Sequence, residues 1–165
     1  MRVAVECYAD LDLFRFLRED CNLTGLSDAH SHSQGEVIND VFARDRADIG
    51  IVDEDPLSTH HRLRDQMVVV ETGVDTETRE HHGRQLIIVK PDLERCFIRA
   101  MGRVGLKSSF GTPSAMHQAL ASSSTRKHQV FRDELKSLRV ACKERGMRSF
   151  VVEIEDRLRL EFGKG

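Results

Sequence analysis

Residues 48–52, "DIGIV", form a short apolar run that ends directly at the acidic group "DED" (53–55). The run has the length and composition of a buried β-strand. Three further runs share this pattern: "RVAVE" (2–6), "MVVVE" (67–71) and "QLIIV" (85–89). Apolar residues at helical spacing follow from about Asp10 and again near 35–46. Strands that alternate with helices and are apolar on both faces predict an α/β fold, with a mostly parallel sheet flanked by helices.

The last third of the chain is predicted to be helical. Pro91 is expected to open a helix over 91–103, and a longer helix is expected over 125–145. In the longer helix one apolar face is formed by Phe131, Leu135, Leu138 and Cys142. We interpret residues 1–165 as a single domain, with a core motif region (1–90), a basic helical extension (91–148) and a C-terminal strand or tail (149–165).

Composition limits the class of protein. With 165 residues, 39% of them hydrophobic, and a mean hydropathy of −0.41, the chain is long enough to bury one core. No apolar run approaches the roughly 18 residues that a membrane-spanning helix needs, and the N-terminus does not read as a signal peptide. The four cysteines lie far apart without a CxxC pair, which is typical of reduced thiols. We therefore expect a cytoplasmic protein that does not enter a membrane.

Charge is unevenly distributed along the chain. The net charge of −2 divides into −10 for residues 1–94, +9 for 95–148 and −1 for 149–165. An acidic first half favours cation binding, and a basic stretch favours a polyanion such as nucleic acid. The alternative is that the two halves neutralise each other where they pack.

Acidic side chains follow two of the predicted strands. Glu6 ends the first strand, while Asp53 and Asp55 follow the strand over 48–52. Neighbouring parallel strands lie about 4.8 Å apart and end at one edge, so these carboxylates are expected to converge. Two carboxylates 4 Å apart repel by about 4 kcal/mol at an effective dielectric of 20, so such a cluster needs a cation or a proton. Magnesium prefers oxygen ligands of this kind. For the two aspartates the alternative is a structural turn before a proline.

Two stretches of the chain, taken together, resemble a known protein family. "VECYADLDLFRFL" (5–17) together with "IVDEDP" (51–56) resembles the Toprim domain of topoisomerases, bacterial primases, recombination proteins and overcoming-lysogenization-defect nucleases. Glu6 matches the family's strand-final glutamate, Asp10 its acid at the start of the next helix, and Asp53 with Asp55 its Asp-x-Asp. Cys7 stands where the family usually has glycine. The stretch "VKPDLERCFIRAM" (89–101) is similar to a helix start in small standalone Toprim-like proteins.

The resemblance implies a Toprim-like, Rossmann-like fold and a metal-dependent nuclease. The aspartates Asp10, Asp53 and Asp55 would hold magnesium or manganese, and Glu6 would act as general acid/base or as a further ligand. A separate ATPase partner is implied because related nucleases carry an ATPase in the same chain, whereas no phosphate-binding loop occurs here. The alternative is a non-catalytic Toprim-like subunit that binds nucleic acid or regulates a partner, and assembly with copies of itself stays open.

Several other residues have two interpretations each. Asp10 also suits a helix N-cap, and Glu94 suits either an added ligand or a first-turn glutamate that favours the helix dipole. Beside the apolar face of the long helix lie four basic residues, which would contact nucleic acid or form a solvated face: Arg132, Lys136, Arg139 and Lys143. Three histidine pairs lie in stretches with loop composition and are interpreted as surface residues: His30 and His32, His60 and His61, and His81 and His82.

Overall fold

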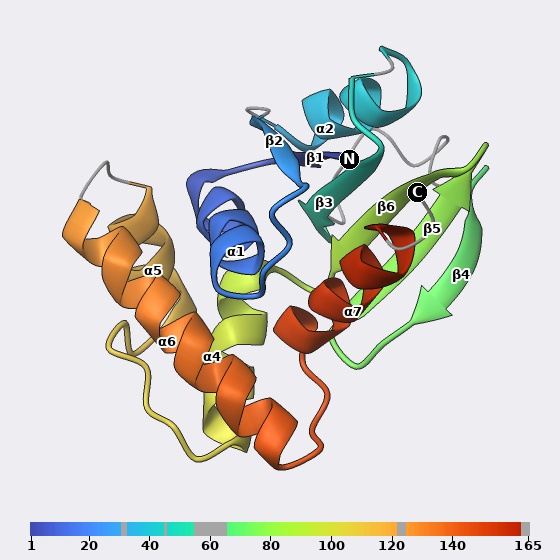
Figure 1. The fold of residues 1–165 in the computed structure, drawn as a ribbon. Helices are drawn as coiled ribbons and strands as arrows, with labels where there is room; N and C mark the ends of the chain where they lie inside the picture. Colours follow the sequence, from blue (N-terminus) through green and yellow to red (C-terminus); the bar gives the residue numbers. More distant parts are fainter. Residues whose placement is uncertain (31–32, 45, 55–65, 122–124, 163–165) are drawn as a thin grey trace.

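The computed structural model describes residues 1–30, 33–44, 46–54, 66–121 and 125–162. Its strands form one sheet in the order β2-β1-β3-β6-β5-β4 (Figure 1). The strands span Arg2–Val5 (β1), Ser27–His30 (β2), Ile49–Asp53 (β3), Val68–Thr72 (β4), Thr76–His81 (β5) and Arg84–Val89 (β6). β2, β1, β3 and β6 are parallel neighbours, whereas β5 and β4 continue the sheet antiparallel. The predicted α/β fold with a mostly parallel sheet is confirmed.

Helices cover the two faces of the sheet unequally. They span Tyr8–Glu19 (α1), Gln34–Phe42 (α2), Leu93–Arg103 (α4), Pro113–Leu120 (α5), Thr125–Glu144 (α6) and Phe150–Phe162 (α7). One apolar core joins α2 to β3 and β6, and a larger one joins the other five helices to the opposite face (Figure 1). The predicted apolar face of α6 is confirmed, because all four of its residues are buried.

The small core is closely packed where α2 crosses β3. A Cβ atom added to Gly50 would lie 2.8 Å from Cγ1 of Val37 and 2.9 Å from Cδ1 of Leu86. Carbon atoms in contact normally lie about 3.5–4.0 Å apart. Glycine at position 50 therefore lets α2 approach the sheet.

Two strands were missed and one was misinterpreted by sequence reasoning. β2 lies in a polar stretch predicted as a loop, and β5, "TETREH", has no apolar run although Thr76, Glu77 and Thr78 are buried. Its polar side chains find polar partners: Glu77, for example, pairs with Arg79 and Lys90. "MVVVE" is not the buried strand that its composition predicts. It forms the exposed antiparallel edge β4, where Val68 is 68% exposed.

The C-terminal segment and one helix start also need correction. Residues 149–165 were expected to form a strand or tail, but Phe150–Phe162 is a helix whose apolar side chains pack into the large core. Pro91 does not open α4. The helix begins at Leu93, and the side chain of Asp92 caps it by accepting a hydrogen bond of 2.7 Å from the backbone N–H of Arg95.

The turn between β4 and β5 is held by α7. The carboxylate of Glu153 accepts hydrogen bonds from the backbone N–H groups of Val74 (2.7 Å) and Asp75 (3.2 Å) and from the hydroxyl of Thr76 (2.9 Å). Asp75 is fully buried and accepts a hydrogen bond from the backbone N–H of Phe150, at the start of α7. A carboxylate on a late helix thus satisfies backbone donors almost eighty residues earlier in the chain.

Candidate functional site

Four acidic residues from different elements lie at the carboxyl edge of the parallel strands. Glu6 follows β1, Asp53 ends β3, Asp10 lies in the first turn of α1, and Glu94 lies in the first turn of α4, which follows β6. β1, β3 and β6 are parallel neighbours, so their carboxyl ends share one edge. The structure therefore brings Glu6, Asp10 and Asp53 together as expected and adds Glu94. The remaining predicted ligand, Asp55, lies outside the described residues. We call these four residues the acidic cluster.

Asp10 is the most deeply buried member of the acidic cluster, with 1% of its surface exposed. Its Oδ2 accepts a hydrogen bond of 3.2 Å from the backbone N–H of Cys7, whereas its Oδ1 has no hydrogen-bond partner among the described residues. Burial, with further contributions from the charges of Glu6 and Glu94, raises the pKa of Asp10 from 3.8 to about 7. The N-cap interpretation of Asp10 is wrong, because Cys7 occupies the cap position and Asp10 is the third helical residue.

Asp53 is held at both its backbone and its side chain. Its carbonyl accepts a hydrogen bond of 2.7 Å from Nε2 of Gln34, and its Oδ1 accepts one of 2.8 Å from the backbone N–H of Leu93. Burial raises the pKa of Asp53 from 3.8 to about 9, and the charges of Asp10, Glu94 and Glu6 contribute. The metal-free acidic cluster therefore retains protons at neutral pH.

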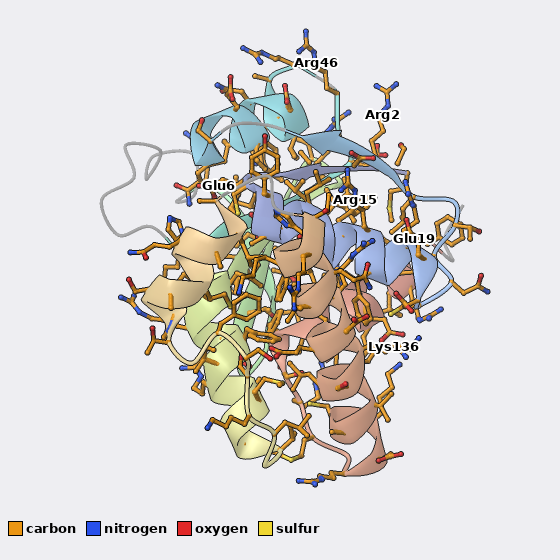
Figure 2. All side chains as sticks on the ribbon, turned by 90° about the vertical axis from the view of Figure 1, so that its left-hand side faces the viewer. Arg2, Glu6, Arg15, Glu19, Arg46 and Lys136 are labelled. Carbon is orange, nitrogen blue, oxygen red and sulfur yellow. The ribbon has the colours of Figure 1, made fainter. Side chains whose placement is uncertain are left out.

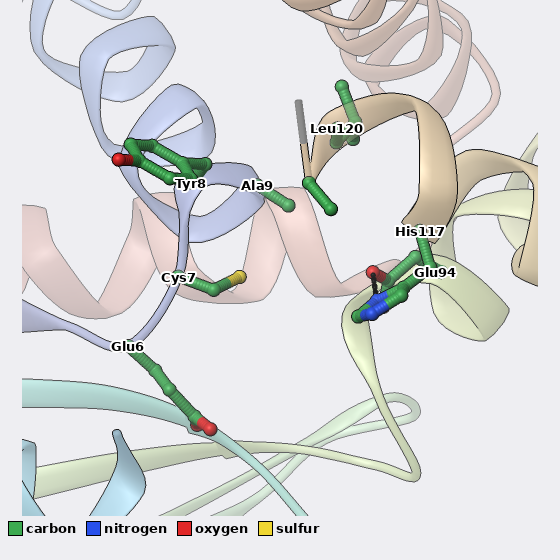
Figure 3. A pocket seen from close by; sticks show the side chains of 8 residues that line it. Glu6, Cys7, Tyr8, Ala9, Glu94, His117 and Leu120 are labelled. Carbon is green, nitrogen blue, oxygen red and sulfur yellow. Dashed lines mark hydrogen bonds and ion pairs between the residues drawn. The ribbon is translucent and has the colours of Figure 1, made fainter. Parts of the chain in front are cut away.

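Glu94 links the acidic cluster to a histidine on α5. Its side chain is buried, and its Oε1 lies 2.9 Å from Nδ1 of His117, whose side chain is 72% exposed (Figure 3). Two cavities meet at this pair. One, of about 220 Å³, is lined by Glu6, Cys7 and Tyr8 among others, and the second, of about 340 Å³, by Asp53 among others. Both interpretations of Glu94 have a structural basis, because it lies in a first helical turn and also faces the acidic cluster.

Cys7 replaces the glycine that the resemblance leads one to expect. Its φ of −131° is extended backbone, which any residue adopts, so the chain path does not require glycine here. Figure 3 shows its side chain lining the cavity between Glu6 and Tyr8. Burial and the nearby charge of Asp10 raise the pKa of the thiol far above its usual range. Cys7 is thus a neutral thiol that narrows the cavity, not a nucleophile.

The oxygen-only donors of the acidic cluster suit a hard divalent cation such as Mg²⁺, completed by water molecules. No group of three or more histidine, cysteine, aspartate or glutamate side chains among the described residues is arranged to hold a metal ion. Asp10 contributes the strongest local reason for a cation, because its buried Oδ1 has no hydrogen-bond donor in the described part of the chain.

The four basic residues on α6 are bound to acids of the same chain. Glu155 of α7, whose side chain is fully buried, accepts hydrogen bonds from Arg139 (2.6 Å) and Lys143 (2.9 Å). Lys136 lies 3.1 Å from Asp20, and Arg132 lies 3.8 Å from a carboxylate oxygen of Glu19. These pairs support the interpretation that the acidic and basic parts of the chain neutralise each other. Contact of the four residues with nucleic acid stays a prediction.

The chemically interesting histidines are not those that stand out in the sequence. His81 and His82 follow each other at the β5–β6 turn, with ring centroids 4.1 Å apart. His60 and His61 lie outside the described residues, as do His32 and the side chain of His30. Sequence reasoning missed His117 and His128, which contact Glu94 and Asp12 respectively. No local pattern could reveal these pairs, because their partners are 23 and 116 residues apart in the chain.

Across the described residues, no helix is both long and apolar enough to cross a membrane. Comparison of the chain with models of protein families, with curated proteins and with solved structures finds no match.

Proposed function

We propose that the protein is a magnesium- or manganese-dependent nuclease of Toprim type that hydrolyses phosphodiester bonds. One observation carries the proposal: Glu6, Asp10, Asp53 and Glu94 meet at the carboxyl edge of a parallel sheet, where one buried oxygen of Asp10 has no hydrogen-bond partner in the described part of the chain. Ligands of open α/β sheets gather at this edge. A cation would balance the mutual repulsion of these carboxylates.

Three residues of the acidic cluster, Glu6, Asp10 and Asp53, have a role in this proposal. Asp10 and Asp53, with Asp55 outside the described residues, would hold the cation, which neutralises charge that develops on phosphate oxygens. The Leu93 N–H orients Asp53 by binding its Oδ1 and leaves Oδ2 for the cation. Glu6 lines the adjacent cavity, where it accepts a proton from the attacking water as the water oxygen bonds to phosphorus. The bond from phosphorus to the leaving sugar oxygen then breaks, and that oxygen takes up a proton from a solvent water molecule.

A cleavage assay tests the proposal. The purified chain is incubated with labelled single- and double-stranded DNA and RNA in Mg²⁺, Mn²⁺ or EDTA, and the products are separated on a gel. We expect cleavage that needs the metal and falls at least about hundredfold in Glu6→Gln, because that substitution removes a proton-transfer group. Glu144→Gln, at an exposed position on α6, is the matched control and should cleave like the parent. Parent-like cleavage by Glu6→Gln would contradict the role of Glu6.

A non-catalytic subunit that binds nucleic acid or regulates a partner is the second candidate. It is favoured by the neutral Cys7 thiol in the cavity and by the lack of a ready three-ligand group among the described residues. This candidate predicts that no substrate is cleaved with either metal, while Mg²⁺ still raises the melting temperature. Metal-dependent cleavage that Asp53→Asn abolishes would exclude it.

A further inference from the structure

A third cavity, of about 250 Å³, lies between the first turns of α1 and the start of α6. Its wall includes Tyr8, Asp12 and Arg15 from α1 and His128 and Arg132 from α6. Unlike the acidic cluster, this wall is rich in cationic and hydrogen-bonding side chains. We call it the basic cavity.

The basic cavity is built around a buried acid–histidine pair. Asp12 is 2% exposed, and its Oδ2 is hydrogen-bonded to Nδ1 of His128. An ionised carboxylate can only accept, so Nδ1 donates and carries a proton. The bond holds the imidazole of His128 in one orientation against the cavity.

Two guanidinium groups add positive charge. Arg15 is exposed, and no ion pair or hydrogen bond to its side chain occurs among the residues that the structure describes. Arg132 donates to Oε1 of Gln129 at 2.7 Å, while its buried Nε has no acceptor in the described ranges. Of the four basic residues noted on α6, it is the one that lines this cavity. The basic cavity therefore offers one guanidinium, that of Arg15, without an ion pair in the described part of the chain, and a second, that of Arg132, whose acidic partner lies 3.8 Å away.

Tyr8 connects the basic cavity to the acidic cluster. It lines both the basic cavity and the cavity that contains Glu6, and it is 51% exposed. Its ring meets that of His128 edge to face, with centroids 6.3 Å apart. Glu6 and Arg15 are seen on the same side of the molecule in Figure 2. An exposed aromatic ring between an acidic centre and a cationic pocket matches a base-stacking platform beside a phosphate site.

We infer that the basic cavity is a phosphate-binding subsite for single-stranded nucleic acid, in which Arg15 and Arg132 hold a backbone phosphate beside His128 while a base stacks on Tyr8. This inference rests on the proposed function, since it supplies the substrate class and direction of approach for the same centre. Single strands fit because their unpaired bases can stack on an aromatic side chain.

Binding is measured separately from catalysis. A short fluorescein-labelled oligothymidylate is titrated with protein in EDTA at several NaCl concentrations, and its fluorescence anisotropy is recorded. Arg15→Gln and Arg132→Gln are each expected to weaken binding about tenfold, as the loss of a charge-assisted hydrogen bond predicts. Each should also lower the slope of log K against log salt by about 0.7. Tyr8→Ala should weaken binding about tenfold without changing this slope.

Arg2→Gln is the matched control, because it removes the same charge from an exposed residue that lines none of the three cavities. Circular dichroism checks that each variant is folded. If Arg132→Gln does not fold, Arg15→Gln, which changes an exposed residue, is a sufficient test by itself. Parent affinity and slope in Arg15→Gln, or no binding by the parent, would overturn the subsite. If the parent binds the oligonucleotide and the variants lose affinity as expected, but no cleavage occurs in Mg²⁺, the phosphate-binding subsite is supported and the nuclease proposal is rejected. Metal-dependent cleavage together with parent-like oligonucleotide binding in the variants would support the nuclease and rule out the phosphate-binding subsite.

Discussion

Asp53→Asn is expected to make the metal-free protein more stable at about pH 8 and to leave its stability nearly unchanged at about pH 4. Burial and three neighbouring carboxylates raise the pKa of Asp53 from 3.8 to about 9. A carboxyl group whose folded pKa is raised stabilises the fold below its unfolded pKa, and this stabilisation is lost as the pH rises through the folded pKa. The parent therefore loses stability between about pH 4 and pH 9, and asparagine does not titrate.

The magnitude follows from the same pKa. Between the unfolded pKa of 3.8 and about pH 8, the free energy of unfolding falls by about 1.36 kcal/mol per pH unit. Asp53 therefore destabilises the parent at about pH 8 by on the order of 5 kcal/mol. For a chain of this length, such a difference shifts the melting temperature by roughly 10 °C or more. Asparagine keeps Oδ1 as an acceptor for the Leu93 N–H, so the substitution removes the charge and retains the hydrogen bond.

The assay is thermal and urea denaturation followed by circular dichroism in EDTA at both pH values. Asp133→Asn, at an exposed position on α6, is the matched control and should behave like the parent at both. If Asp53→Asn melts at or below the parent temperature at about pH 8, burial and the neighbouring carboxyl groups do not raise the folded pKa of Asp53. The reasoning behind the acidic cluster as a cation site would then be refuted.

Two further changes test the scaffold. Glu155→Gln should lower the free energy of unfolding, measured by urea denaturation, by about 3–5 kcal/mol, because three cationic side chains share this buried carboxylate. A loss below about 1 kcal/mol would show that these ion pairs are dispensable for stability. Burial alone would raise the pKa of Glu155, but its hydrogen bonds lower it from 4.5 to about 2, so this stabilisation should be present above about pH 4.5 and disappear as the pH falls through 2. Gly50→Ala should cost about 1–3 kcal/mol through overpacking against Val37 and Leu86, and an unchanged urea midpoint would mean that α2 shifts freely.

The position of the acidic cluster could be predicted because it depends on local pattern. β1, β3 and β6 are buried on both faces and are therefore apolar throughout, so their carboxyl ends, and with them Glu6 and Asp53, can be located from the sequence. Glu94 was recognised as a first-turn residue. Its place beside the aspartates depends on β6 pairing with β3, which periodicity alone does not reveal.

Features that depend on distant partners could not be predicted. β5 buries polar residues that find polar partners, Glu77 with Arg79 and Lys90 and Thr76 with Glu153, so its sequence lacks the apolar alternation of a strand. The valines of β4 look like core residues, yet the strand forms an edge. Asp12 and His128 are 116 residues apart, and their contact exists only because α6 packs on α1.

The hydrogen bonds that Glu153 accepts from the β4–β5 turn have a consequence for the time course of folding. The turn gains its side-chain acceptor only when a helix almost eighty residues later docks, and contacts between such distant residues form slowly because a long loop must close first. During synthesis, the exposed edge β4 will therefore have left the ribosome well before α7 can secure the turn beside it. The nascent chain therefore passes through a period in which the hairpin that carries this valine-rich edge lacks the support of Glu153, and that interval is when a chaperone would benefit it most.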